Sequence, residues 1–287
     1  MVVLVLVVVL AFVGLGKHGS SGTSSLAPAD VVNAVTHVPS STLNSVGIGT
    51  TVGASAVRPP EKTSTASVLK SGGKPLVLYM GADYCPYCAA ERWPLVVALS
   101  RFGTFHNLGS TTSSSTDVLP NTPTFSFYKA KYSSPYIAFQ GVEQATRTGQ
   151  PLQKATAAQQ SLYNAYERPP YLQSATQAGI PFVDFANRFI VVGVTLPPQA
   201  LRTAGGSPLP MGTIAGSLSD PATAPAKAVD ASANYMTAAI CVATHGAPSS
   251  VCKAQGVVEA SRVLSLEPVG LGTTASTGTK SPTPLAG

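Results

Sequence analysis

The chain has 287 residues, 44% of them hydrophobic, which is enough apolar side chain for one large domain or two small ones. Its formal net charge is +6, although only 10% of the residues are charged. The 18 lysines and arginines are scattered, with no basic run of five or more, so the charge argues against a nucleic-acid-binding protein.

Residues 1–16 are almost wholly apolar and predict a transmembrane anchor or a signal-like segment. As a helix this segment is about 24 Å long, which is short for the roughly 20 residues that a bilayer span needs. It has no basic region ahead of the apolar run, which suggests that residues precede Met1. Because no Ala-x-Ala cleavage site follows, an uncleaved anchor is favoured over a signal peptide.

The cysteines indicate on which side of the membrane the domain lies. They form two pairs, Cys85/Cys88 and Cys241/Cys252, and an even number in close pairs suits an oxidising compartment. Lys17, directly after the apolar run, favours the opposite orientation by the positive-inside rule. We give the cysteines more weight and expect a single-pass protein of the cell membrane, with its domain on the extracytoplasmic side.

Residues 17–60 are rich in Ser, Thr, Gly, Ala and Pro and predict an extracytoplasmic spacer. Within it, residues 30–35 suit a short helix and residues 44–57 alternate weakly like a strand. The main domain is expected over residues 61–265, beginning with a short helix at 61–69. Residues 266–287 are mostly Gly, Thr, Ser, Pro and Ala and predict a disordered tail.

The central motif is Cys85-Pro-Tyr-Cys88, placed between two apolar segments. Residues 75–80 before it have the length of a buried strand, and the segment after it has helical length and ends near Phe102. Cys85 is therefore expected to be exposed at the first helical turn, where unpaired backbone N–H groups stabilise a thiolate. Pro86 suits the first helical position. Cys88, one turn deeper, can resolve a mixed disulfide formed on Cys85.

A strand, Cys-Pro-Tyr-Cys and a helix in this order resemble the active-site segment of the thioredoxin superfamily. The run Gly-Ala-Asp-Tyr-Cys-Pro-Tyr-Cys-Ala-Ala-Glu-Arg-Trp at 81–93, with residues 98–103, is similar to a narrower group, the family called domain of unknown function 929. The likeness covers roughly residues 69–252 and continues through residues 124–127, 134–137, 180–184 and 239–241. It implies a thioredoxin-like α/β sheet flanked by helices, but the family name implies no reaction.

The resemblance also implies a cis-proline opposite the dithiol, whose preceding backbone faces a substrate strand. Pro123 lies nearer the spacing of small thioredoxins, but Pro181 precedes a clearer hairpin and is favoured. Ile180 would then line a substrate groove together with Tyr84, which stands where the superfamily usually has tryptophan. Trp93 is a further groove candidate, although packing between helix and sheet is favoured for it.

The choice of Pro181 makes residues 104–178 an inserted region with its own strands and helix. Aromatic alternation predicts strands at 124–128 and 136–140, and an apolar face predicts a helix at 151–167. Residues 179–185 and 189–193 predict a hairpin, and residues 226–244 predict another helix.

Cys85 and Cys88 have three interpretations: a redox dithiol, half of a zinc site and a structural disulfide. Zinc knuckles usually repeat the close spacing, whereas ten residues separate Cys241 from Cys252. The redox interpretation is favoured, with no metal and no organic cofactor. Pro-Tyr is also the dipeptide typical of glutaredoxins, but the apolar N-terminus, the second cysteine pair and the chain length argue against that group.

Two acidic residues near the motif have open roles. The negative charge of Asp83 would raise a thiol pKa rather than lower it. Glu91, one turn after Cys88, is either a proton relay or a residue on a solvated helix face. The predicted strand before the motif lacks the buried carboxylate that many thioredoxins use for proton transfer.

Cys241 and Cys252 are expected to form a structural disulfide, which stabilises by roughly 2–4 kcal/mol in the chain-entropy account. His245, in the loop between them, is interpreted as a surface residue rather than a metal ligand.

Together these patterns predict an anchored extracytoplasmic thiol–disulfide oxidoreductase that acts on protein cysteines, with Cys85 attacking and Cys88 resolving. Its expected partners are protein thiols and disulfides, a redox partner protein and the membrane, but no nucleic acid. The alternative is a non-enzymatic, membrane-tethered binding module with structural disulfides. The direction of the reaction, the substrate and the oligomeric state stay open.

Overall fold

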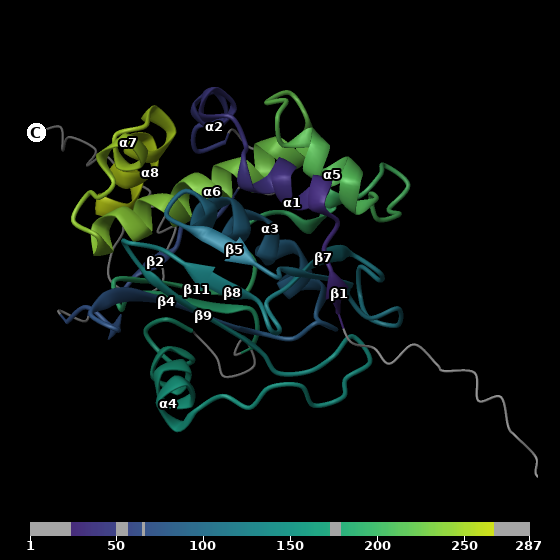
Figure 1. The fold of residues 1–287 in the computed structure, drawn as a ribbon, viewed down its shortest axis with the longest axis horizontal. Helices are drawn as coiled ribbons and strands as arrows, with labels where there is room; N and C mark the ends of the chain where they lie inside the picture. The colour runs from purple at the N-terminus through teal and green to yellow at the C-terminus, as the bar shows by residue number, and fades with distance from the viewer. Residues whose placement is uncertain (1–23, 50–56, 65–66, 173–178, 267–287) are drawn as a thin grey trace, which may run out of the picture.

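The computed structural model describes residues 24–49, 57–64, 67–172 and 179–266. At its centre is a mixed β-sheet with helices on both faces, as the predicted α/β class requires (Figure 1). Helices α3 (Pro86–Ser100) and α6 (Ala224–Ala243) pack together on one face. Helix α4 (Ala157–Tyr166) lies on the other.

The strands that position the motif lie side by side in the order β9, β4, β10, β11. Their bounds are Lys74–Gly81 for β4, Ala138–Glu143 for β9, Phe182–Phe185 for β10 and Phe189–Val192 for β11. Strand β4 runs parallel to β9 and antiparallel to β10, and β10 pairs with β11 as a hairpin. A parallel pair needs a crossover connection, and α3 begins that connection.

Strand β4 is apolar because both of its faces are covered. Successive side chains point to opposite faces of a strand. Val77 and Tyr79 accordingly join the main core with α3 and α6. Leu78 and Met80 join a smaller core with Tyr166 of α4. The motif at the end of β4 is therefore held by a strand that both cores fix in place.

The predicted hairpin forms, with residues 186–188 as its turn. Ala186 and Asn187 have positive φ angles of 56° and 62°, and asparagine tolerates this conformation better than most residues. The backbone N–H of Asn187 donates to the Asp184 carboxylate at 2.8 Å, which stabilises the turn. Strand β2 (Glu61–Lys62) pairs with β11, and β3 (Lys70–Ser71) pairs with the start of β4. Strand β2 lies at the start of the helix predicted over residues 61–69, and the described residues of that range are not helical.

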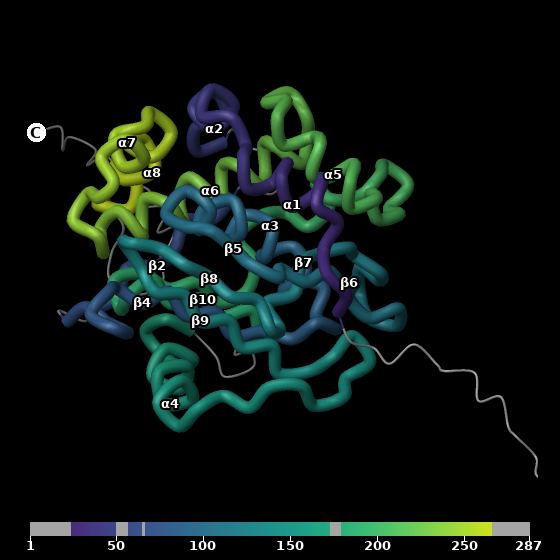
Figure 2. The backbone as a smooth tube through the Cα atoms, in the orientation of Figure 1, coloured from purple at the N-terminus to yellow at the C-terminus, as the bar shows by residue number. Residues whose placement is uncertain are grey.

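The prediction of a spacer is wrong for residues 24–49. This segment forms β1 (Ser25–Leu26), α1 (Ala29–Thr36) and α2 (Ser40–Val46), and Val31, Val35 and Leu43 are buried in the main core. Helix α1 packs on α5 (Met211–Ser217), and α2 packs on α6 and α8 (Gln255–Leu266). Figure 2 shows this N-terminal segment beside the C-terminal helices. Composition suggested a linker because the few apolar residues that anchor the segment are separated by small polar ones.

The predicted insertion at 104–178 is also revised. Strand β9 pairs with β4 from Leu76↔Ala138 to Gly81↔Glu143, so it belongs to the central sheet, and α4 covers a face of that sheet. The rest of this range contributes to two smaller sheets. Strand β5 (Thr104–His106) pairs with β8 (Lys131–Ser133), and β6 (Gly109–Thr112) lies between β1 and β7 (Pro123–Ser126).

After β11 the chain continues through the short 3₁₀ helix η2 (Pro198–Leu201), α5, α6, α7 (Ser249–Cys252) and α8. The predicted anchor at 1–16 and nearly all of the predicted tail lie outside the described residues. Within the described ranges, none of the helices combines the length and the apolar character needed to cross a bilayer.

The predicted disulfide joins Cys241, at the end of α6, to Cys252 in α7, with Cα atoms 5.7 Å apart and a sequence separation of 11. Replacing both cysteines with alanine is expected to lower the free energy of unfolding by about 2–4 kcal/mol, because a closed loop restricts the unfolded chain. Urea unfolding of the full chain measures this loss. No change in the unfolding midpoint would contradict a stabilising role.

Candidate active site

Cys85 is the N-cap residue of α3, at the point where β4 gives way to the helix. Its backbone is extended, with φ −72° and ψ 122°, and its Sγ accepts a hydrogen bond from the backbone N–H of Cys88 at 3.2 Å. Pro86 occupies the first helical position, where a missing N–H leaves no carbonyl unpaired. The sequence Cys-Pro-Tyr-Cys therefore directs a helical N–H group at the first sulfur.

The two thiols are unequally buried. Cys88 is 0% exposed, and Cys85 keeps 5% of its surface exposed. The expectation of an openly exposed Cys85 is therefore wrong, although the order of depth is as predicted. The Cys85 thiol donates to the carbonyl oxygen of Ile180 at 3.6 Å, so the segment before β10 closes over it. A partner must approach Cys85 through the small part of its surface that stays open.

The surroundings of the two sulfurs shift their pKa values in opposite directions. A hydrogen bond from the Cys88 thiol lowers the pKa of Cys85, and burial opposes this; the Cys88 backbone N–H and the Arg92 guanidinium also lower it. Burial raises the pKa of Cys88 well above its ordinary value, and the neighbouring Cys85 adds to the increase. Cys85 is thus the sulfur of the pair that ionises first, and a thiolate is the reactive form of cysteine.

A fully buried ion pair lies beneath the dithiol. The Arg92 guanidinium donates from Nε to Glu143 Oε1 at 2.9 Å and from Nη2 to Glu143 Oε2 at 2.6 Å, and both side chains are 0% exposed. Arg92 Nη2 also donates to the Ala82 carbonyl at 2.9 Å. This contact ties α3 to the turn that precedes Cys85, so Arg92 both positions the turn and supplies positive charge near the sulfurs.

Asp83 completes this buried cluster. Its Oδ1 lies 3.7 Å from Arg92 Nη2, and its side chain is 0% exposed. Burial raises the pKa of Asp83 to about 6, and Arg92 limits the increase. Sequence reasoning identified Asp83 as the charge that would act on a thiol, but Arg92 is the charged side chain that shifts the pKa of Cys85.

Ile180 and Pro181 lie beside the dithiol, as the resemblance implies. The Ile180–Pro181 bond is cis, and the Pro181 carbonyl accepts from the backbone N–H of Gly193 at 2.8 Å. The other candidate, Pro123, begins β7, and its carbonyl accepts from Trp93 Nε1 at 3.0 Å. Only Pro181 therefore sits next to Cys85.

Trp93 does not line a groove. It is 0% exposed and packs edge-on against Phe125, with ring centroids 4.9 Å apart, so the alternative of helix–sheet packing is the one observed. Tyr84, by contrast, is partly exposed next to Cys85. The position of Trp93 along α3 could not distinguish a groove residue from a packing residue, because both faces of α3 are covered.

Glu91 does not lie on a solvated face of α3. It is 0% exposed, and its carboxylate accepts from the backbone N–H and the hydroxyl of Thr195 at 2.8 and 2.9 Å. Burial raises the pKa of Glu91 to about 7. Its contacts join α3 to the segment after β11, which gives it a structural role.

Sequence reasoning missed Arg92 and Glu143. The available signal was the spacing of Cys88 and Arg92, which are four residues apart and therefore share a helix face. Nothing in the local pattern identified Glu143, because it comes from β9, far along the chain.

The Cys241–Cys252 disulfide bears on the zinc interpretation of the motif. It leaves neither of its sulfurs free to share a zinc ion with Cys85 and Cys88.

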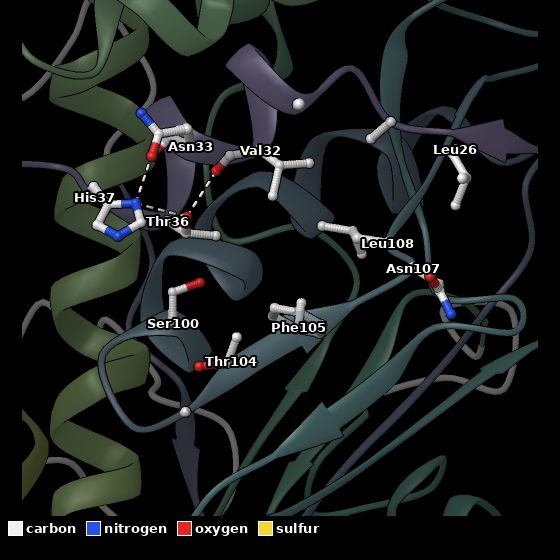
Figure 3. Close-up of a pocket in the computed structure, with 13 residues that line it drawn as sticks. Leu26, Val32, Asn33, Thr36, His37, Ser100, Thr104, Phe105, Asn107 and Leu108 are labelled. Atoms are coloured by element: carbon white, nitrogen blue, oxygen red, sulfur yellow. Dashed lines mark hydrogen bonds between the residues drawn. The ribbon is translucent and has the colours of Figure 1, made fainter.

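A cavity of about 500 Å³ lies at the other end of α3, beside Ser100 and Gly103 (Figure 3). Helix α1 forms one wall, and His37 there hydrogen-bonds to the Asn33 carbonyl at 3.0 Å. Because the dithiol is at the first turn of α3, this cavity is separate from the candidate active site.

The pKa shifts predict how the thiols react with iodoacetamide at different pH. In the reduced protein, the alkylation rate of Cys85 is expected to rise through a midpoint below the unperturbed cysteine value of about 8.5. The midpoint for Cys88 is expected above it. Mass mapping of each cysteine between pH 5 and pH 10 measures both, with the urea-unfolded protein as the control. Equal midpoints in the folded protein would contradict the assignment of Cys85 as nucleophile.

The family model described as Domain of unknown function (DUF929) matches residues 62–242, which is more than half of the chain. The match includes the dithiol, Arg92, Glu143 and the Ile180–Pro181 bond. No curated protein and no solved structure matches the chain.

Proposed function

The chain belongs to the DUF929 family, and we propose that it is a membrane-anchored extracytoplasmic thiol–disulfide oxidoreductase that acts on protein cysteines. The observation that carries this proposal is the geometry at the start of α3. Cys85 Sγ receives a helical N–H group at 3.2 Å and has a lowered pKa, while Cys88 is buried with a raised pKa. This division of roles suits one attacking and one resolving thiol.

The arrangement of elements supports a thioredoxin-like assignment. When β5–β8, η2 and α5 are left out, the chain order of the unit is β4-α3-β9-α4-β10-β11-α6, with β9 parallel and β10 antiparallel to β4. The dithiol begins the helix after β4, and a cis-proline precedes β10 beside it. These are the features that the sequence resemblance implied for the superfamily.

The reaction proceeds by two exchanges of sulfur partners. The Cys85 thiolate attacks one sulfur of a substrate disulfide, which forms a mixed disulfide and releases the other substrate sulfur as a thiolate. The Cys88 thiol then loses its proton and attacks Cys85, which forms the Cys85–Cys88 disulfide and releases the second substrate thiolate. Two electrons pass from the protein dithiol to the substrate, and a redox partner protein restores the dithiol. The reverse sequence oxidises a substrate.

The proposed location rests on residues 1–16 and on the second cysteine pair. The Cys241–Cys252 disulfide supports an oxidising compartment, where structural disulfides persist. The apolar segment at 1–16 supports a membrane anchor, with the domain on the extracytoplasmic side.

The alternative is a tethered binding module without redox activity, and the low exposure of Cys85 favours it. Competition between the two thiols separates these functions. With substoichiometric iodoacetamide at pH 7, an oxidoreductase places most of the label on Cys85. Slow and equal labelling of Cys85 and Cys88 would overturn the proposed activity in favour of the binding module.

A further inference from the structure

A cleft of about 440 Å³ opens beside Tyr84, the residue before Cys85. Two loops form its sides, residues 114–117 and residues 147–149, and Tyr84 forms a third wall. Its lining includes several hydroxyl groups and two charged side chains, Asp117 and Arg147.

Both loops are hydrogen-bonded to the segment that precedes Cys85. The backbone N–H of Ser114 donates to the Tyr84 carbonyl at 2.8 Å, and the N–H of Asp83 donates to the Ala145 carbonyl at 2.9 Å. Tyr84 and Cys85 are chain neighbours, with Cα atoms about 3.8 Å apart. Because Tyr84 lines the cleft and adjoins Cys85, the cleft lies near the path of an extended substrate bonded to Cys85, which advances about 3.3–3.6 Å per residue.

Arg147 is the group in this cleft best suited to bind an anion. Its Nη2 donates to Asn121 Oδ1 at 3.0 Å and to the Ser113 carbonyl at 3.4 Å, which hold the guanidinium in place. Among the described residues, no carboxylate forms an ion pair with it. A neutral amide and a carbonyl thus position the cation and leave its charge uncompensated.

Asp117 is the opposing charge in the cleft. It is exposed, and its Oδ1 accepts from the neighbouring backbone N–H of Val118 at 2.7 Å. Water and salt screen an exposed carboxylate more than a guanidinium that is partly enclosed. The cleft therefore keeps a net preference for a negative group.

We propose that this cleft recognises an acidic side chain next to the cysteine of the polypeptide substrate, with Arg147 binding the carboxylate. The inference rests on the proposed function and adds to it a class of substrate: extracytoplasmic proteins with Asp or Glu within two residues of the reacting cysteine. With Nη2 bonded to Asn121 and Ser113, the rest of the guanidinium supplies charge-assisted donation to a carboxylate.

Two peptide disulfides that differ only in Glu or Gln beside the cysteine test this inference. The reduced full-length protein is expected to reduce the Glu peptide about fivefold faster than the Gln peptide. This is the rate difference expected from one partly exposed, charge-assisted hydrogen bond. Arg147→Gln is expected to remove this preference, so that the two peptides are reduced at equal rates. Arg262→Gln, which removes an exposed arginine from α8, is the matched control and should keep the preference.

Equal rates for the two peptides in the unmodified protein, or a preference that persists in Arg147→Gln, would overturn the inference. Binding of the same peptides with serine in place of cysteine gives a readout that needs no redox step. If neither disulfide is reduced but the Glu peptide still binds about fivefold more tightly, the proposed function fails and the cleft assignment stands. If exchange occurs without any Glu preference in rate or binding, the cleft assignment fails alone.

Discussion

Replacing Cys85 with serine is expected to reduce disulfide exchange by more than about 10³-fold, the loss typical of removing a nucleophile. A serine hydroxyl stays protonated at neutral pH and forms no disulfide, while the N–H group that stabilised the thiolate remains in place. Reduction of a peptide disulfide by the full-length protein, followed as released thiol, measures the change.

Cys88→Ser is the matched variant for this prediction. It keeps the attacking sulfur but removes the resolving one, so a mixed disulfide between Cys85 and the peptide is expected to accumulate. Mass spectrometry of the protein under non-reducing conditions detects that adduct. Residual exchange in Cys85→Ser, or an adduct on Cys88 in place of Cys85, would contradict the assigned roles.

Glu143→Gln is expected to cause the largest loss of stability among single substitutions near the site, about 3–5 kcal/mol. The Glu143 carboxylate accepts from Arg92 Nε and Nη2 and also from the backbone N–H of Phe127 at 3.1 Å, all within a fully buried region. Glutamine keeps the shape but removes the charge. Arginine remains protonated in proteins, so the variant leaves the buried cation with the Asp83 carboxylate, 3.7 Å away, in place of its closest counter-charge.

Urea unfolding of the full chain measures this loss, with both proteins in the same detergent. Glu259→Gln is the matched control, because Glu259 in α8 is partly exposed and accepts from Gln255 Nε2 at 3.1 Å. Its cost is expected to stay within about 0.5 kcal/mol, as for most surface substitutions. Similar losses in the two variants would show that the buried pair contributes no more than a surface contact.

The sequence predicted those features that short segments determine. The end of β4, the start of α3 and the hairpin of β10 and β11 follow from apolar runs, a proline at the first helical position and a turn that contains asparagine. Cys85, Cys88 and Pro181 meet because the hairpin pairs with β4, and the resemblance implied only that a cis-proline lies opposite the dithiol.

The remaining features depend on contacts between distant segments. Glu143 reaches Arg92 only because β9 returns beside β4, and no local pattern encodes that pairing. Trp93 and Glu91 looked like surface candidates because a helix is usually covered on one face, whereas α3 is covered by the sheet, α1 and α6. Residues 24–49 resembled a linker because three buried side chains, Val31, Val35 and Leu43, are enough to dock two short helices.

The central claim is that Cys85 and Cys88 cycle between a dithiol and a disulfide, and their reduction potential tests it most directly. The full-length protein is equilibrated in thiol–disulfide buffers of graded potential, and the two cysteines are then quantified by alkylation and mass mapping. We expect a single two-electron transition between about −270 mV and −120 mV, the range of known exchange proteins. A pair that stays reduced in every buffer, or one that stays bridged below about −300 mV like a structural disulfide, would contradict the account.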